Sequence, residues 1–299
     1  MDDSASAAEY GRRLNASLQL MDTSYADQLT LDDVAATAHF SKYHFHRLFL
    51  ATYGETPGEY LRRVRLEKAA QLLKMRFDYT ITRIAMETGF SSPAVFSRAF
   101  RKHFGTTAKV YRQRSRTARN LADVGSARCR DRRFDESFAP TEIRRLERLH
   151  LVYVRSMAGY GPVVSKAWRT LFAWAYTKGL VVPGVRLFGI PLDDPEITPT
   201  QRCRYLSALT VAEPAEAEGR IERMTLESGW YAVFPFEDSP DGIGRLYERV
   251  YGAWLPRSGY QPDDRPTLEE YPAEYAQPGV SHESGPSLRF TLLFPVRPL

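Results

Sequence analysis

The sequence predicts two domains of different fold class. The first is an all-α domain with two helix-turn-helix units, and the second is an α+β domain whose helices cover one face of an antiparallel sheet. Three observations predict this division: an internal repeat in the N-terminal half, alternating strand-like and helix-like runs in the C-terminal half, and basic residues concentrated in the first half. A chain of 299 residues is long enough for two domains of ordinary size.

The internal repeat relates residues 29–60 to residues 80–111, and each copy is typical of a helix, a tight turn and a second helix. At an offset of 50 residues the matching pairs are Leu31 with Ile81, Val34 with Ile84, Ala35 with Ala85 and Phe40 with Phe90. At an offset of 51 they are Phe45 with Phe96, Arg47 with Arg98, Phe49 with Phe100, Gly54 with Gly105 and Tyr60 with Tyr111.

The first helix of the first copy begins at a capping box. Thr30 is followed three positions later by Asp33, so each side chain can satisfy a backbone N–H group of the other. The spacing of Leu31, Val34 and Ala35 predicts that these three residues share the buried face of a short helix.

The turn and the second helix of each copy carry their own start and stop signals. Ser41 is a predicted N-cap, and Gly54 ends the helix as a residue that tolerates a positive φ angle. In the second copy Gly89 occupies the turn, Ser92 is the predicted cap and Pro93 fits the first helical position. The apolar stripe of the first of these helices consists of Phe45, Leu48 and Phe49.

One helix connects the two copies and another precedes them. Thr56 and Glu59 form a second capping box with Pro57 at the first helical position, which predicts a long helix over residues 57–75. A further helix is expected at about residues 7–25. The result is a predicted seven-helix domain.

Residues 115–140 interrupt this pattern, because they are polar, rich in charge and without an apolar period. Such a segment is typical of a linker. The predicted boundaries are therefore 1–114 for the helical domain, 115–140 for the linker and 141–299 for the second domain.

The second domain is predicted from β-rich runs separated by Pro, Gly and Asp clusters. A strand is expected at 149–156 and helices at 163–178 and 243–254, where apolar residues recur at helical spacing. The remaining predicted strands are 184–190, 204–211, 229–236 and 288–295. Their order is strand, helix and strands, twice over.

The charge distribution indicates a polyanionic partner for the first half. Residues 1–145 hold 25 Lys and Arg against 17 Asp and Glu, whereas residues 146–299 hold 16 against 19. Charge alone leaves a membrane surface, RNA and DNA open. Because much of the excess lies on the two repeated units, we expect duplex DNA.

Several classes of protein are disfavoured. No apolar run reaches the roughly 18 residues of a membrane span, and the acidic N-terminus is unlike a secretory signal. Cys129 and Cys203 are too few for a disulfide framework, which favours a cytoplasmic location. The six histidines show no metal-ligand spacing with them, and there is no GxSxG elbow or phosphate loop. We therefore expect no bound metal, no cofactor and no enzymatic activity.

The candidate DNA-contacting residues lie on the second helix of each copy, which a helix-turn-helix presents to the major groove. In the first copy Tyr43, His46 and Arg47 share one face, and Lys42 adds a donor near the helix start. In the second copy the candidates are Ser92, Ser97, Arg98, Arg101 and Lys102. Arginine can read guanine in bidentate fashion, whereas lysine and hydroxyl groups more often hold phosphate.

Backbone contacts could also come from the connecting helix, where the candidates are Arg62, Arg63 and Arg65. The alternative is that each basic cluster is an ordinary solvated helix face. On that interpretation His46 is a surface histidine and Tyr43 a half-buried packing residue.

Residues 31–111 resemble the AraC/XylS transcription regulators. The strings FSKYHFHRLF…GETPGEYLRRVRLEKAAQLL and IAMETGFSSPAVFSRAFRKHFG carry the resemblance. It implies a monomeric module whose two recognition helices enter successive major-groove faces on one side of the DNA. By position it implicates Tyr43, His46 and Arg47 in the first helix, and Pro93, Ala94, Ser97 and Arg98 in the second. Pro93 and Ala94 depart from the pattern because neither offers a side-chain hydrogen bond, and Ala108 stands where the family usually has proline.

Residues 141–299 resemble the GyrI-like effector domains through the strings YGAWLPRSGYQPDDRPTLEEY and FGIPLDDPEITPTQRCRYLSALTV. This resemblance implies two pseudo-repeated βαββ-type modules around a cleft for small ligands, often cationic and aromatic. It places Glu269 in that cleft, with Tyr271, Trp254 and Tyr153 as further candidate ligand contacts. A carboxylate among aromatic rings attracts an organic cation. The alternatives are an exposed strand-end glutamate beside Glu270, and core roles for Trp254 and most other aromatic residues.

Together these features predict a sequence-specific DNA-binding transcription regulator whose C-terminal domain senses a small ligand, with RNA polymerase as a further candidate partner. Two alternatives remain. The C-terminal domain could be a small-molecule hydrolase in which Glu269 is the base and Tyr271 assists, or a protein-interaction module without a ligand.

Overall fold

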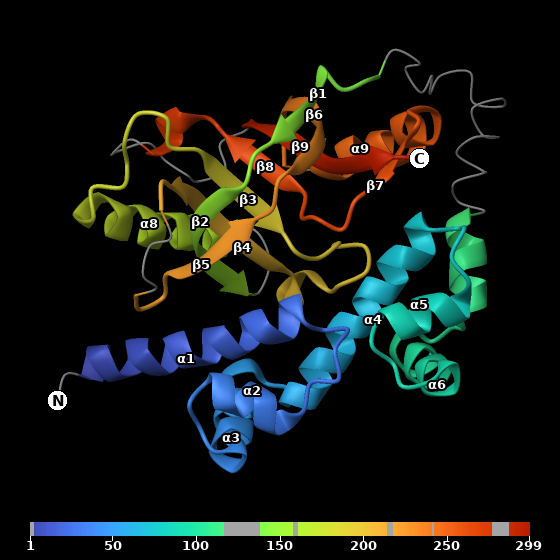
Figure 1. Ribbon diagram of the computed structural model, residues 1–299, viewed down its shortest axis with the longest axis horizontal. Coiled ribbons are helices and arrows are strands. Elements are labelled where there is room, and N and C mark those ends of the chain that lie inside the picture. The colour runs from blue at the N-terminus through green and yellow to red at the C-terminus, as the bar shows by residue number, and fades with distance from the viewer. Residues whose placement is uncertain (1–2, 117–137, 158–160, 214–217, 241, 277–286) are drawn as a thin grey trace. The chain divides into compact units, whose positions relative to one another are not determined.

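The computed structural model describes residues 3–116, 138–157, 161–213, 218–240, 242–276 and 287–299. The chain divides into two compact units, Met1–Arg128 and Cys129–Leu299 (Figure 1). Most of the linker predicted at 115–140 lies outside the described residues. None of the described helices is long and apolar enough to cross a membrane.

The N-terminal unit is all-α, as the repeat predicts. Its elements are α1 (Asp3–Thr23), α2 (Leu31–Thr37), α3 (Lys42–Tyr53), α4 (Pro57–Met75), α5 (Ile81–Glu87), α6 (Pro93–Phe104) and a helical stretch at residues 108–116. Helices α2 and α3 form the first helix-turn-helix unit, α5 and α6 form the second, and α4 connects them. The predicted seven helices are therefore present among the described residues.

Side-chain caps begin these helices where the sequence predicts them. Thr30 and Thr56 each form a complete capping box with the acidic residue three positions later. The hydroxyl groups of Ser41 and Ser92 each accept a hydrogen bond from the backbone N–H three positions later. Because a cap satisfies N–H groups that the helix itself leaves unpaired, these start points are determined locally.

The repeat in sequence is also a repeat in packing. Phe49 packs edge-on against Tyr60 with 5.7 Å between ring centroids, and Phe100 packs edge-on against Tyr111 at 5.5 Å. Both phenylalanines are wholly buried. Leu31 differs from its prediction, since it remains 37% exposed as the first residue of α2.

The two tight turns use different residues for the same backbone conformation. Gly89 has a φ of 79°, and His39, at the equivalent position of the first copy, has a φ of 53°. A Cβ atom on Gly89 would lie 2.6 Å from the carbonyl oxygen of Ala26. The second turn therefore needs glycine for its φ and for its space, whereas the first holds a non-glycine residue in the left-handed region.

Within the described residues, the C-terminal unit is a nine-stranded antiparallel sheet with α-helices packed on one face. Its strands are β1 (Glu142–Leu146), β2 (Leu149–Met157), β3 (Leu187–Pro191), β4 (Arg204–Val211), β5 (Glu222–Leu226), β6 (Gly229–Asp238), β7 (Tyr260–Pro262), β8 (Leu268–Tyr271) and β9 (Leu288–Pro298). Its long helices are α8 (Pro162–Thr177) and α9 (Gly242–Arg249). Strands β1, β5, β7 and β8 add to the predicted runs.

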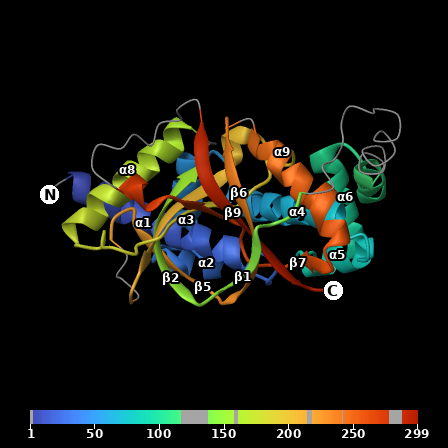
Figure 2. The same ribbon diagram turned by 90° about the horizontal axis from the view of Figure 1, so that it is seen from above.

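Two βαββ modules are visible in the strand order. The path through the sheet is β1-β6-β9-β8-β3-β4-β2-β5, with β7 paired to β9. The first module is β2, α8, β3 and β4, and the second is β6, α9, β8 and β9, so that β3 and β8 meet at the centre. Figure 2 shows α8 and α9 along different halves of the sheet.

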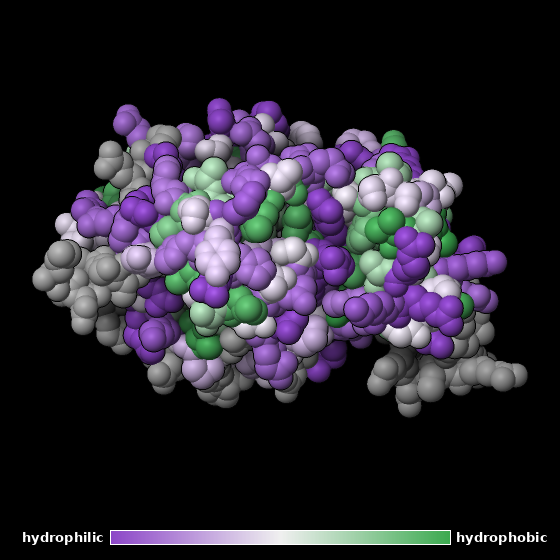
Figure 3. All heavy atoms as spheres, turned by 90° about the horizontal axis from the view of Figure 1, so that it is seen from below, coloured by the Kyte–Doolittle hydropathy of each residue, from purple (hydrophilic) through white to green (hydrophobic). Residues whose placement is uncertain are grey.

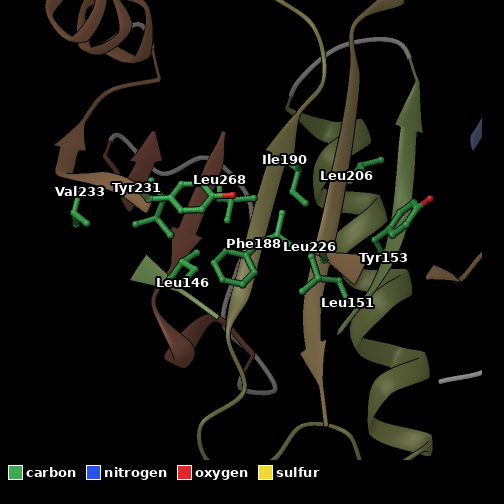
Figure 4. Close-up of a cluster of buried hydrophobic side chains, with 12 residues drawn as sticks. Leu146, Leu151, Tyr153, Phe188, Ile190, Leu206, Leu226, Tyr231, Val233 and Leu268 are labelled. Atoms are coloured by element: carbon green, nitrogen blue, oxygen red, sulfur yellow. The ribbon is translucent and has the colours of Figure 1, made fainter. Parts of the chain in front are cut away.

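Two very short connections curl this sheet. Only residues 147–148 separate β1 from β2, although β1 is one edge of the sheet and β2 lies next to the other. Residues 227–228 join β5 to β6 in the same way, and Arg148 and Glu227 pair across the two connections at 3.4 Å. The curl encloses a hydrophobic cluster on the face away from the helices, which includes Tyr153 (Figure 4).

Candidate functional site

The first recognition helix, α3, presents an arginine held against an aromatic ring. The guanidinium carbon of Arg47 lies 4.6 Å from the centre of the Tyr43 ring, and Tyr43 is 66% exposed. His46 is half-buried on the same helix, and Lys42 pairs with Asp32 at 3.4 Å. Phe45 and Phe49 occupy the buried face. The helix therefore turns its polar residues outward while its phenylalanines form the core.

The second recognition helix, α6, presents a more basic surface. Ser97, Arg98, Arg101 and Lys102 are exposed, and the last two lie in its final turn. Ser92 is half-buried, and its hydroxyl group caps the helix. In the space-filling view, hydrophilic side chains cover most of the displayed face around smaller hydrophobic patches (Figure 3).

The structure corrects the candidate backbone contacts of the connecting helix α4. Arg63 is buried, and its guanidinium group pairs with Glu55 at 2.7 Å and with Glu67 at 3.1 Å. Arg65 donates hydrogen bonds to the backbone carbonyls of residues 25 and 27 at 2.6 and 2.7 Å. Both guanidinium groups are engaged within the helical unit, Arg63 in its interior and Arg65 half-buried, and Arg62 is the exposed member of the three.

In the C-terminal unit, a buried carboxyl group lies at the centre of the sheet, on its helix-covered face. Glu269 of β8 is 4% exposed, and its Oε2 atom accepts hydrogen bonds from the hydroxyl groups of Tyr205, at 2.6 Å, and Tyr271, at 3.1 Å. Gly189 of β3 makes room for this arrangement, since a Cβ atom there would lie 1.7 Å from the Tyr205 hydroxyl. Two tyrosines from different strands thus converge on one oxygen.

Burial dominates the electrostatics of this carboxyl group. It raises the pKa of Glu269 from 4.5 to about 7, while the hydroxyl groups of Tyr205 and Tyr271 lower it by a smaller amount. Among the described residues, no Lys or Arg forms an ion pair or hydrogen bond with Glu269. The carboxyl group is therefore suited to pair with a positive charge that the described residues do not supply.

Aromatic rings surround the Glu269 centre. Trp168 of α8 approaches Tyr271 edge-on at 5.8 Å between ring centroids, and Phe290 of β9 lies 5.7 Å away. A hollow of about 670 Å³ beside this centre is lined in part by Tyr271, Phe236 and Phe290, and Glu269 itself is not among its lining residues. Both modules thus contribute to the surroundings of one carboxyl group.

The predicted ligand residues do not all meet at this centre. Glu269 and Tyr271 do. Tyr153 lies on the opposite face of the sheet, where its hydroxyl donates to Glu222 at 2.8 Å (Figure 4). Trp254 is 9% exposed and packs edge-on against Phe234 at 5.3 Å, which is the core role that the sequence left open.

Tyr205 and Trp168 are the contacts that the sequence did not identify. Tyr205 lies in an ordinary β-rich run, and Trp168 lies on the predicted apolar face of a helix. Neither has a local signal, because each meets Glu269 or Tyr271 only through the pairing of distant strands and the position of α8.

Comparisons with known proteins identify both units. Residues 34–114 match a helix-turn-helix domain family, and residues 139–284 match the GyrI-like small molecule binding domain. The chain is 27% identical over 282 residues to the right origin-binding protein of Escherichia coli K12, covering 90% of this chain and 92% of that protein. It is 42% identical over 85 residues to the probable transcription factor PqrA of Proteus vulgaris, covering 28% of this chain and 69% of that protein.

A solved AraC-type transcriptional regulator from Chromobacterium violaceum aligns with 34% of this chain and 91% of its own, at 32% identity and a TM-score of 0.33. The family matches and the PqrA relative agree with the two helix-turn-helix units and the paired βαββ modules. The chain therefore belongs to the AraC-type DNA-binding transcription regulators, and its C-terminal unit is a GyrI-like small molecule binding domain.

Proposed function

We propose that this protein is a one-component transcription regulator that binds promoter DNA through α3 and α6 and senses a small organic cation at Glu269. The observation that carries the proposal is the buried carboxyl group among aromatic rings, without a basic partner in the described structure. RNA polymerase is a further proposed partner, and the cytoplasm is the proposed location. The proposed domain boundaries are 1–114 and 141–299.

The DNA-binding part of the proposal assigns different tasks to the exposed side chains. Arg47 and Arg98 occupy equivalent positions of the repeat and read guanine edges, while Tyr43 and His46 contact neighbouring bases. Phosphate contacts are assigned to Lys42, Ser92, Ser97, Arg101 and Lys102.

A mobility-shift titration against genomic fragments at physiological salt tests these assignments. Arg47→Ala should cost about 1–3 kcal/mol and relax specificity at one base position. Arg12→Ala, on α1, is the matched control and should leave specificity unchanged. If Arg47→Ala lowers DNA affinity equally for all sequences, Arg47 contacts phosphate rather than a base. If the wild type shows no sequence preference, the proposal of sequence-specific DNA binding is rejected.

The ligand-binding part follows from charge and ring chemistry. An aromatic cation would ionise Glu269 and gain cation–π contacts with Tyr271, Tyr205 and Trp168. Because the carboxyl group must lose its proton, the apparent Kd should be about tenfold higher at pH 6 than at pH 8.

Tetraphenylphosphonium is a suitable probe, and uncharged triphenylphosphine oxide is its matched control. We expect the cation alone to raise the melting temperature, and Glu269→Gln to abolish that response. Equal stabilisation by both compounds, or an unchanged response in Glu269→Gln, would reject a cation site at Glu269.

The same carboxyl group is also the basis of the hydrolase alternative. A pKa of about 7 suits a general base at neutral pH. Product formed from an electrophilic ligand by the wild type but not by Glu269→Gln would establish an enzyme. Ligand recovered unchanged after long incubation supports a sensor.

A further inference from the structure

The chain that enters the C-terminal unit is held by aromatic contacts at Phe138. Its ring stacks on Phe234 of β6, with 5.2 Å between the centroids and 19° between the planes. The guanidinium carbon of Arg249, the last residue of α9, lies 3.9 Å from the centre of the Phe138 ring. Three residues later, the backbone N–H and the hydroxyl group of Thr141 both donate to the carbonyl of Val233, at 2.8 and 3.2 Å. Phe138 is thus clamped between a strand and a helix.

Helix α9 changes its winding at this clamp. After Arg249 the chain continues as a π-helical turn, Val250–Trp254. The Trp254 ring packs edge-on against Phe234 at 5.3 Å, so the ring that stacks on Phe138 also contacts the π-helical turn. π-Helical turns are rare in proteins, and those that occur often lie at functional sites.

One hydrophobic cluster connects the clamp to the Glu269 centre. Phe138 and Tyr271 both pack against the cluster under α9, which contains Phe234 and Phe290. Tyr271 reaches that cluster through Phe290 at 5.7 Å, and its hydroxyl group donates to Glu269. Protein interiors are close-packed, so a displaced side chain presses on its neighbours, and Tyr271 packs against the same cluster that contains Phe234.

We propose that Phe138 and Arg249 form the contact through which ligand binding at Glu269 changes the chain segment that leads to the DNA-binding unit. This inference rests on the proposed function. The ligand takes the place of the Tyr271 hydroxyl beside Glu269, the cluster under α9 repacks, and the clamp on Phe138 loosens. Coupling then arises because the ligand binds the loosened state more tightly than the clamped state.

The first test needs no ligand and uses amide hydrogen exchange of the full-length protein. Tyr271→Phe removes only the hydroxyl group, which donates a hydrogen bond to Glu269 and lies 3.1 Å from the Tyr205 hydroxyl. We expect it to accelerate exchange at Thr141 and at residues 250–254 by about threefold or more, because the clamp loosens. Val182→Ala, at an exposed loop position, is the control and should change neither region. Unchanged exchange at both regions in Tyr271→Phe would overturn the coupling.

The second test measures DNA affinity with and without tetraphenylphosphonium. We expect the cation to change the affinity of the wild type about fivefold or more, and that of Phe138→Ala by less than about twofold. The Kd for the cation should fall, by up to the same factor, because Phe138→Ala removes the clamped state that binds the cation less tightly; a higher Kd would contradict the coupling. A full DNA response in Phe138→Ala would overturn the proposal.

Arg249→Ala provides a second variant if Phe138→Ala folds poorly, because it removes the cation–π contact and leaves the ring in place. It should also reduce the DNA response. If the wild type does not bind the cation at all, the proposed ligand site fails, whereas the exchange measurement still decides whether Tyr271 and the clamp are coupled.

Discussion

Replacing Glu269 by glutamine should remove a pH dependence from the stability of the C-terminal unit. Burial raises the pKa of this carboxyl group from 4.5 to about 7, so the folded state holds a proton that the unfolded state releases between these values. The free energy of unfolding is therefore highest at acidic pH and falls as the pH rises through 7. Glutamine has nearly the same shape, still offers an oxygen to Tyr205 and does not titrate.

The two pKa values determine the size of the effect. They predict that the free energy of unfolding of the wild type falls by about 2–3 kcal/mol between pH 5 and pH 8, and Glu269→Gln should lack this decrease. All four tryptophans lie between residues 168 and 254, so their fluorescence reports urea unfolding of the C-terminal unit within the full-length protein. Glu248→Gln, at an exposed position of α9, is the control. A difference between wild type and Glu269→Gln that stays constant from pH 5 to pH 8 would refute the assignment.

Three further predictions concern the helical unit, whose melting is followed by circular dichroism. His39→Gly should raise the free energy of unfolding by about 1 kcal/mol, since glycine adopts the positive φ without strain. Gly89→Ala should lower it by more than that, because the new methyl group would meet the Ala26 carbonyl oxygen at 2.6 Å; equal stability of this variant would contradict the close approach. Arg63→Ala should cost about 3–5 kcal/mol by removing the guanidinium group that pairs with two buried carboxylates, whereas Arg62→Ala should change stability by less than about 0.5 kcal/mol. Similar values for the two arginine variants would show that the buried ion pairs contribute little.

The helices of the N-terminal unit could be predicted from the sequence because their start points depend on neighbouring residues. Thr30, Ser41, Thr56 and Ser92 each cap the helix that they were expected to cap, because a cap needs only residues three positions apart. The repeat also matched Phe45 with Phe96 and Phe49 with Phe100, and all four are buried, whereas Phe40 is half-buried and its match Phe90 is buried. Local patterns failed where burial depends on distant partners, as at Arg63, which was a candidate DNA-backbone contact and instead pairs with two buried glutamates.

In the C-terminal unit, the sequence alone determined the alternation of strands and helices and, by family resemblance, the position of Glu269. Only the tertiary structure decided which tyrosines meet that carboxyl group. Tyr205 and Glu269 are 64 residues apart and converge because β3 pairs with both β4 and β8, while Gly189 leaves space between them. Strand register places Tyr153 on the face opposite Glu269, since neighbouring residues of a strand point to opposite faces. The alternation of side chains along each strand can be predicted from the sequence. Which side chains share a face with Glu269 depends on which strands pair and on which face the helices cover.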